Sequence, residues 1–256
     1  ITAKKEHRLL AHIEAGLRSF DLRMPEEINR MVTDRLSDLL FTPDRLAGDN
    51  LRREGTPEDR IRFVGNIMID TLEAGREEAA RLDARAVVAH RAVPGLTGAR
   101  AAIEPDHFGV VTLHRPSNVD DPAILGPLVE WLAGVIAPQL PLVWSLHPRT
   151  RQRLEAFGLW DRLAAARGIT LVGPLGYHEM LCLNLAARIM LTDSGGLQEE
   201  CCVTGTPCLT LRENTERPAT LVVNGGVSEL TGNRVDRMHD AFQRLNQVGR
   251  HTHRPE

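Results

Sequence analysis

The sequence of 256 residues lacks several features that mark whole classes of protein. No apolar run approaches the ~20 residues that a membrane-spanning helix needs. The net charge is −3 and the basic residues are scattered, which does not indicate a nucleic-acid-binding surface. No HExxH motif, cysteine cluster, Walker loop or GxGxxG after a strand is present, so the sequence predicts no metal site and no dinucleotide fingerprint.

Cysteine is also scarce. The four cysteines (Cys182, Cys201, Cys202 and Cys208) lie in one stretch and contain no CxxC pair. Adjacent cysteines very rarely bridge each other, and this pattern favours a reduced protein of the cytoplasm over a disulfide-linked secreted one.

What the sequence does contain is an alternation of short β-rich runs and helical patterns. Candidate strands cover 61–66, 108–114, 141–147, 168–173, 188–193 and 207–212, and candidate helices cover 67–82, 122–137, 149–157, 177–187 and 196–204. Near-continuous apolar strands separated by helices predict an α/β fold whose parallel sheet is covered on both faces. With 42% hydrophobic residues, the chain can form one large core or two modest ones.

The first 66 residues read as part of a separate α/β domain, with the second domain over 67–256. Pro25 marks a helix start, and the segment AHIEAGLRS resembles a strand end followed by a tight glycine turn. The pattern places a series of apolar residues at helical spacing after Pro25: Ile28, Met31, Val32, Leu36, Leu39 and Leu40. Four-residue spacings predict surface pairs of Arg30 with Glu26 and with Asp34, each worth ~0.3–0.5 kcal/mol.

Polar residues stand where the candidate strands end. In a parallel α/β sheet, ligands bind at the carboxyl ends of the strands. The polar or ionisable positions on this edge are His114, His147, the loop 174–177, Asp193 to Gly196, and Arg212 to Asn214. The sequence therefore predicts a binding site along this edge.

The segment DSGGLQEE, 193–200, is the most specific of these. Gly195 and Gly196 allow the backbone to approach a ligand closely, and the helix that follows offers unpaired N–H groups to an anion. Glu200 lies one turn into that helix, where it does not suit a phosphate but suits the two hydroxyls of a ribose. An ordinary strand–turn–helix with glycine for tightness is the alternative.

Cationic side chains accompany two other strand ends. Arg115 follows His114 and Arg149 follows His147 by two positions, and guanidinium groups match the oxygens of a diphosphate. Each histidine alone is equally well explained as a loop cap. Arg217, in NTERP at the end of the last strand, is a surface charge or a further cation of the same edge.

Carboxylates near the first glycine turn are the remaining candidates. Glu14 is either a helix cap or a catalytic acid/base, and the residues alone leave both open. Glu26 and Glu27 suit the N-terminus of a helix electrostatically, which favours a structural role for at least one of them.

Seven segments taken together resemble one family. In order along the chain they are HIEAGLRSFDLRMPEEINRMVTDRLSDLLF, VGNIMIDTL, TLHRPSNVD, LHPRT, LTDSGGLQEE, GTPCLTLR and NTERP. This series, from about Ala11 to Gly232, is similar to the non-hydrolysing UDP-N-acetylglucosamine 2-epimerases. The resemblance implies a glycosyltransferase-B-like fold of two Rossmann-like domains and interconversion of UDP-GlcNAc and UDP-ManNAc without an oxidised cofactor. In that reaction the C2 proton is removed while UDP leaves by anti elimination, and UDP then adds back.

The resemblance also implies roles for single positions. Glu14 and Glu26 match carboxylates of the acid/base set, and His114 matches a histidine near the departing diphosphate. The binding positions that match are Ser194 and Gly195 for phosphate, Glu200 for ribose, Arg217 for the diphosphate, Met180 with the loop from Tyr177 for uracil, and His147 with Arg149 for a second, regulatory UDP-GlcNAc. The family is commonly dimeric, which implies a homodimer.

Two segments expected of the family are missing from the sequence, the start of the first domain and a final helix. The chain is therefore expected to be a fragment that does not necessarily turn over. A retaining UDP-sugar glycosyltransferase of the same fold and a non-catalytic UDP-sugar-binding module are the alternatives. An enzyme acting on another UDP-2-acetamido sugar fits the residues equally well.

Overall fold

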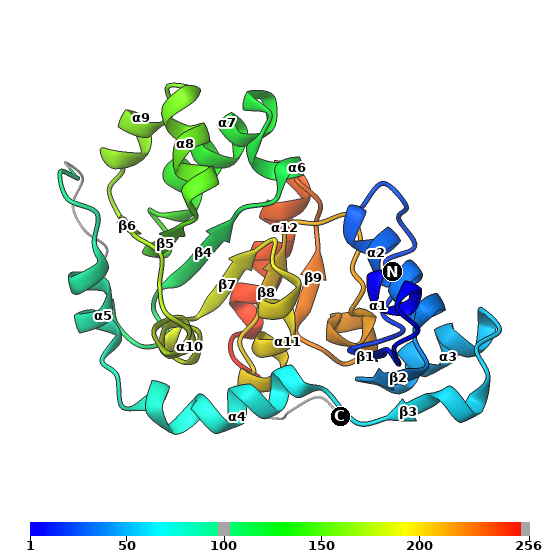
Figure 1. Cartoon of the computed structure of the whole chain (residues 1–256). Helices are drawn as coiled ribbons and strands as arrows, with labels where there is room; N and C mark the ends of the chain where they lie inside the picture. Colours follow the sequence, from blue (N-terminus) through cyan, green and yellow to red (C-terminus); the bar gives the residue numbers. More distant parts are fainter. Residues whose placement is uncertain (97–102, 252–256) are drawn as a thin grey trace. The chain divides into compact units, whose positions relative to one another are not determined.

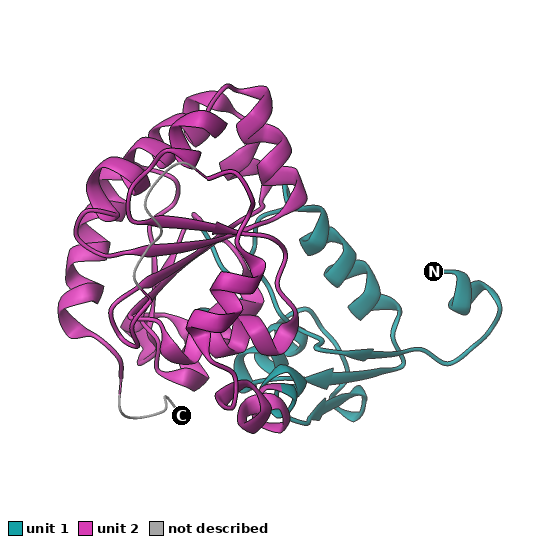
Figure 2. Ribbon diagram, turned by 90° about the vertical axis from the view of Figure 1, so that its left-hand side faces the viewer, with its two compact units in different colours: residues 1–71, 214–218 teal, residues 72–213, 219–256 magenta. Residues whose placement is uncertain are grey.

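The structure, a computed structural model, describes residues 1–96 and 103–251. Its contacts divide the chain into two compact units (Figure 2). Unit 1 comprises Ile1–Thr71 and Asn214–Pro218, and unit 2 comprises Leu72–Glu213 and Ala219–Glu256. The domain boundary expected after residue 66 falls at the start of a helix, α4, and stays a prediction.

Unit 2 is built on a six-stranded parallel sheet with the strand order β6-β5-β4-β7-β8-β9 (Figure 1). The strands are β4 (Gly109–Leu113), β5 (Leu142–Leu146), β6 (Ile169–Val172), β7 (Ile189–Thr192), β8 (Cys208–Thr210) and β9 (Ser228–Leu230). Relative to their order in the chain, this is the 3-2-1-4-5-6 arrangement of a Rossmann fold. The first five strands were expected from the sequence, whereas β9, with only three residues, was not.

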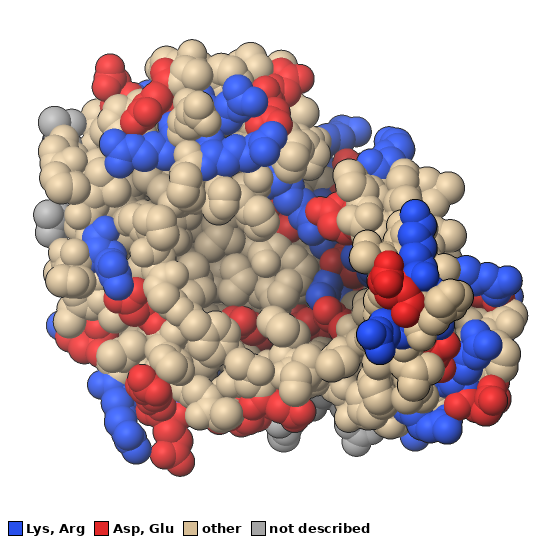
Figure 3. Space-filling model, in the orientation of Figure 1, with Lys and Arg blue, Asp and Glu red and all other residues tan. Residues whose placement is uncertain are grey.

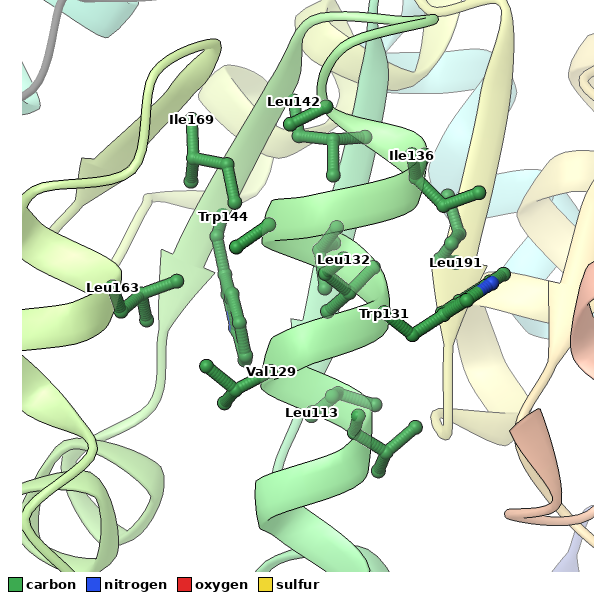
Figure 4. Close-up of a cluster of buried hydrophobic side chains, with 14 of the residues drawn as sticks. Leu113, Val129, Trp131, Leu132, Ile136, Leu142, Trp144, Leu163, Ile169 and Leu191 are labelled. Carbon is green, nitrogen blue, oxygen red and sulfur yellow. The ribbon is translucent and has the colours of Figure 1, made fainter.

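Helices cover both faces of this sheet. Alternate residues of a strand point to opposite faces, so each strand contributes side chains to two cores. Val111 and Leu113 face a core formed with α7, α8, α9 and α12, whereas Val110 faces α5, α10 and α11. Figure 4 shows the first of these cores, in which Trp144 and Leu132 are fully buried. Both faces of the sheet are buried under helices, which explains why the strands read as continuous apolar runs.

Helix α4 begins in unit 1 and continues into unit 2, and the helices from α4 onward follow the expected positions where these were predicted. They are α4 (Ile67–Ala80), α5 (Ala84–Arg91), α6 (Pro116–Val119), α7 (Pro122–Trp131) continued by a π-helical turn (Leu132–Ile136), α8 (Pro148–Ala156), α9 (Trp160–Ala164), α10 (Tyr177–Ala186), α11 (Gly195–Thr204) and α12 (Val235–Val248), with short 3-10 turns at Pro218–Thr220 and Val222–Asn224. Among the described residues, even the two longest helices have only 14 residues, and no helix has the length and apolar character needed to cross a membrane.

Unit 1 contains a three-stranded parallel sheet in the order β1-β2-β3. Its strands are β1 (Ala11–Ile13), β2 (Leu39–Thr42) and β3 (Ile61–Phe63), and its helices are α1 (Thr2–Lys5), α2 (Pro25–Leu36) and α3 (Arg45–Arg53), with a 3-10 turn at Glu58–Arg60. The expectation that Leu39 and Leu40 continue the helix from Pro25 was wrong. Helix α2 ends at Leu36, and after Ser37 the chain pairs with β1 instead.

The face that α2 buries is polar. Ile28, Met31 and Val32 are each more than a third exposed, whereas Glu27 and Asp34 are the buried residues of this helix. The expected surface pairs of Arg30 were also wrong, because Arg30 binds Glu27 at 2.6 Å. Asp34 is instead buried, and its hydrogen-bond and ion-pair partners lie outside α2.

Candidate functional site

The candidate site of unit 2 lies where the strand order reverses. Strands β4 and β7 are neighbours although β5 and β6 lie between them in the chain, and ligands of doubly wound sheets bind at this switch point. His114 follows β4 and Ser194 follows β7 by two positions, so both stand at the carboxyl edge of the two central strands. His114 and Ser194 lie at the same edge because β4 and β7 are neighbours in the sheet, whatever the length of the loops that follow these strands.

A buried carboxylate joins the two strand ends. Asp193 has no exposed surface and accepts hydrogen bonds from the backbone N–H groups of His114 at 3.0 Å and Arg115 at 2.9 Å. The Asn118 amide also donates to it at 3.0 Å, and its Oδ1 lies 2.8 Å from Nδ1 of His114. The Nε atom of Arg115 donates to the Asp193 carbonyl at 2.8 Å. Arg115 is therefore held along the switch point by the backbone.

Asp193 is stable as a carboxylate in this setting. Burial by itself raises the pKa of the Asp193 carboxyl, but the hydrogen bonds from His114, Arg115 and Asn118 outweigh burial and lower that pKa below its ordinary value. A buried negative charge with this many donors keeps the turn after β4 and the turn after β7 in one arrangement.

The helix that follows β7 presents its N-terminus at the same edge. Ser194 is the N-cap of α11, with its side chain accepting from Leu197 N at 3.5 Å, and Gly195 and Gly196 are the first two helical residues. Their N–H groups have no partner within the helix, and the helix dipole adds partial positive charge there. This arrangement can hold an anion such as phosphate.

The second predicted histidine caps another helix. His147 is the N-cap of α8, and its Nδ1 accepts from Arg149 N at 3.2 Å. The rings of His147 and His114 lie 5.5 Å apart between centroids. The guanidinium of Arg149 binds Asp120, to which Arg153 also donates at 3.0 Å. Hydrogen bonds from Arg149 lower the pKa of Asp120 to about 2.

A pocket of about 240 Å³ lies between these elements. It brings together four of the predicted site residues, His114, His147, Met180 and Ser194, with Leu197 as an apolar wall. Figure 3 shows the surface over this part of unit 2 hollowed, with basic side chains gathered over α8. Two histidines, a helix N-terminus and apolar walls make a site that suits a phosphate-bearing ligand with a flat apolar part.

The other predicted residues of unit 2 are not among the described side chains that line this pocket. Arg115, Arg149 and the two glycines are outside the set that lines the pocket. Glu200 is 8% exposed on α11, and burial, with Glu199 as a smaller cause, raises its pKa to about 7. Burial and the charge of Glu200 also raise the pKa of Tyr177, so these two side chains influence each other electrostatically.

In unit 1, Glu14 and Arg217 form an ion pair. Arg217 Nη2 lies 2.8 Å from Glu14 Oε1, and the same guanidinium also binds Glu216. Glu14 has a backbone φ of +70°, a left-handed conformation that is costly for a residue with a side chain and is often found at functional sites. Glu26 is exposed at the first turn of α2, while Glu27 is buried and accepts from Phe20 N at 2.9 Å.

The side chains that hold the Glu14 turn were not predicted from the sequence. Asp34 Oδ2 accepts from Gly16 N at 3.1 Å and binds Arg18 at 2.7 Å, and its other oxygen lies 2.5 Å from His12 Nδ1. Asn50 of α3 donates to the Gly16 carbonyl at 2.9 Å. These buried contacts fix the turn after β1 on which Glu14 stands.

The doubly wound parallel sheet and the pocket at its switch point define an α/β protein with a Rossmann-type unit, whose pocket is of the kind that holds phosphate-bearing ligands. The chain belongs to the UDP-N-acetylglucosamine 2-epimerase family, whose sequence model matches residues 1–255. The family resemblance inferred from the seven segments is thereby confirmed.

Individual relatives agree with this membership. The UDP-N-acetylglucosamine 2-epimerase of Methanocaldococcus jannaschii is 42% identical over 91% of this chain and 61% of its own length. The UDP-2,3-diacetamido-2,3-dideoxy-D-glucuronate 2-epimerase of Pseudomonas aeruginosa is 41% identical over 84% of this chain and 55% of its own length.

Solved structures resemble the chain as well. A crystal structure of the Methanocaldococcus jannaschii UDP-GlcNAc 2-epimerase in complex with UDP-GlcNAc and UDP matches with a TM-score of 0.85 and 38% identity, covering 99% of this chain and 66% of that one. The predicted α/β fold with parallel sheets is confirmed. This chain spans less than two thirds of the length of these two relatives and of the crystallised chain.

Proposed function

We propose that this chain supplies the nucleotide-binding unit and part of the acid/base set of a UDP-N-acetylglucosamine 2-epimerase, an isomerase that interconverts UDP-GlcNAc and UDP-ManNAc. The observation that carries the proposal is the pocket at the β4–β7 switch point, lined by His114, His147, Met180 and Ser194. Similarity to an epimerase whose crystal structure holds UDP-GlcNAc and UDP supports it.

The nucleotide is assigned to unit 2. The diphosphate is placed at the N-terminus of α11, where Ser194, Gly195 and Gly196 offer N–H groups, with His114 beside it. Uracil is assigned to the apolar wall that includes Met180, and the ribose hydroxyls to Glu200. An ionised Glu200 accepts two hydroxyl hydrogen bonds well, and these would offset the burial that now raises its pKa.

The reaction balances without an external oxidant. A carboxylate removes the C2 proton, the C–H electron pair forms a C1–C2 double bond, and the C1–O bond breaks to release UDP and 2-acetamidoglucal. A proton is then returned to the opposite face of C2 while the UDP oxygen forms a bond to C1. Neutralising the departing diphosphate with His114, Arg115 and a helix N-terminus stabilises the charge that develops there.

Glu14 and Glu26 are the carboxylates proposed for this proton transfer. Glu14 is held by its ion pair with Arg217, whose Nη2 lies 2.8 Å from Glu14 Oε1. This ion pair gives Arg217, proposed on the family resemblance as a cation for the diphosphate, a second role in holding Glu14. A general acid/base typically contributes 10²- to 10⁴-fold to a rate.

The deciding experiment is hydrogen exchange in heavy water. We expect UDP-GlcNAc incubated with the protein, with no acceptor present, to yield UDP-ManNAc and to carry deuterium at C2 in both sugars by NMR. Glu14→Gln should lower the exchange rate by about 10²- to 10⁴-fold. UDP release that needs an added acceptor, with hydrogen retained at C2, would instead identify a retaining glycosyltransferase. Nucleotide binding with neither reaction would identify a binding module.

A second substrate has a specific observation in its favour, since the Pseudomonas aeruginosa relative that is 41% identical acts, by its name, on a diacetamido glucuronate. The two UDP-sugars are best compared as rival substrates in the same exchange experiment. Faster exchange of the diacetamido sugar would reassign the substrate without changing the reaction.

We also infer a homodimer in the cytoplasm, with UDP-GlcNAc as an allosteric activator near His147 and Arg149. All four cysteines are free thiols in the structure, which suits a reducing compartment. Light scattering of the purified protein tests the dimer. If the rate of UDP-ManNAc conversion does not depend on added UDP-GlcNAc, the proposal that UDP-GlcNAc is an activator is wrong.

A further inference from the structure

The two histidines of the pocket use the same ring nitrogen in opposite ways. Nδ1 of His114 lies 2.8 Å from a carboxylate oxygen of Asp193, whereas Nδ1 of His147 faces the backbone N–H of Arg149 at 3.2 Å. In a neutral imidazole one nitrogen carries the proton and the other accepts, and the partner of one nitrogen decides which. The surroundings of the two rings therefore determine their tautomers.

For His114, the partner admits only a donor. Both oxygens of the Asp193 carboxylate are already acceptors, receiving the N–H groups of His114 and Arg115 and the amide of Asn118. A carboxylate with this many donors, and with a lowered pKa, is ionised and can only accept. Nδ1 of His114 must then carry a proton, which leaves Nε2 for the pocket.

For His147, the partner admits only an acceptor. The N–H of Arg149 is the first-turn donor of α8 and can only donate, so Nδ1 of His147 must be unprotonated while it caps this helix. The proton of the neutral ring is then on Nε2. A second proton on Nδ1 would meet the Arg149 N–H and break the cap.

We propose, on the basis of the function proposed above, that Asp193 is a positioning residue for His114 and gives this ring a task different from that of His147, whose tautomer the Arg149 N–H determines. Asp193 holds His114 with Nδ1 protonated, so that Nε2 accepts from a ligand or takes up a proton whose charge Asp193 balances. His147, whose Nδ1 caps α8, presents Nε2–H as a donor. The ring centroids are 5.5 Å apart, close enough for one phosphate-bearing group to contact both.

Nitrogen NMR of the whole chain tests this directly. With ¹⁵N-labelled histidine at about pH 8.5, where an ordinary imidazole is neutral, we expect His114 to show a protonated Nδ1 and an unprotonated Nε2. His147 should show the reverse, and His114→Gln and His147→Gln assign the signals. A spectrum in which both rings share one tautomer, or in which the two are exchanged, overturns the proposal.

The Asp193→Asn variant isolates the cause. An amide places an NH₂ group among donors, so we expect the His114 nitrogens to shift toward the other tautomer while those of His147 stay in place. Asp236→Asn, at an exposed pair with Arg234, is the matched control and should shift neither. Unchanged His114 signals in Asp193→Asn would refute the role of Asp193. If that variant does not fold, the wild-type spectrum still decides the tautomers.

Added UDP separates this proposal from the proposed function. We expect UDP to move the Nε2 signals of both rings. Opposite tautomers with no response to UDP would leave the tautomer assignment standing and remove the nucleotide site. UDP binding to a chain whose two rings share one tautomer would support the nucleotide site and refute the tautomer assignment.

Discussion

Replacing Glu200 with glutamine should make unit 2 more stable at alkaline pH. The Glu200 side chain is 8% exposed on α11, and burial raises its pKa from 4.5 to about 7. Glutamine has nearly the same shape but no charge, so Glu200→Gln removes the ionisation while keeping the packing.

The sign and size follow from linkage. Below pH 4.5 the carboxyl is protonated in both the folded and the unfolded chain, and its ionisation contributes no difference. Between 4.5 and about 7 the unfolded chain ionises first, so the free energy of unfolding falls as pH rises. A shift from 4.5 to about 7, at 1.36 kcal/mol per unit, amounts to about 3 kcal/mol above pH 7.

Tryptophan fluorescence provides a reading confined to this unit, because Trp131, Trp144 and Trp160 all belong to unit 2. In urea unfolding at pH 5 and pH 8, we expect the wild type to lose about 2.5 kcal/mol more than Glu200→Gln between the two values, because part of the total is already lost at pH 5. Glu155→Gln, on the exposed side of α8, should behave like the wild type. Equal pH dependence in wild type and Glu200→Gln would refute the burial of an ionisable Glu200.

Three further substitutions test other parts of the structure. Asn118→Ala removes buried hydrogen bonds to Asp193 and to the Leu211 carbonyl, and should lower the stability of unit 2 by about 1–3 kcal/mol in the same fluorescence assay. Gly16→Ala puts a Cβ 2.3 Å from the Ala47 carbonyl oxygen at a φ of +83°, and should lower amide-exchange protection throughout unit 1. Ser194→Ala removes the cap of α11, should cost about 1 kcal/mol, and should weaken UDP binding in calorimetry. Unchanged protection, stability or binding in the corresponding variant would contradict the contact concerned.

The architecture of unit 2 was largely predictable because its signals are local. Strands such as β5, whose five residues are all buried, are apolar throughout, and helices buried on one side separate them. The order of the strands does not follow from these local signals, because the chain passes from β6 to β7 and β7 pairs with β4. The strand β9 escaped prediction because SEL is short and carries a glutamate.

Helix α2 shows where local periodicity misleads. Its apolar residues Ile28, Met31 and Val32 have helical spacing, yet they are more exposed than Glu27 and Asp34 on the same helix. Both buried carboxylates accept hydrogen bonds from backbone N–H groups of the turn after β1. The periodicity of the apolar residues does not reveal such bonds. The end of the helix was misplaced for a related reason, since Leu39 and Leu40 fit both a helix and a strand and only pairing with β1 decides.

The same physical demand shaped both candidate sites. The turn after β1 and the turn after β4 both leave N–H groups without a strand partner, and in each unit a buried carboxylate accepts from them: Asp34 from Gly16 in unit 1, and Asp193 from His114 and Arg115 in unit 2. In both cases the carboxylate also binds a histidine ring, at 2.5 Å for His12 and 2.8 Å for His114. The sequence marks the residues that would meet a ligand, because they follow strands and glycines. It shows Asp193 only as one polar residue of the sheet edge and places Asp34 at the helix surface, because the N–H groups from which these carboxylates accept lie 18 to 79 residues away. A carboxylate that falls on the buried side of a helix or at the end of an apolar strand is therefore the pattern to search for beside a predicted catalytic turn.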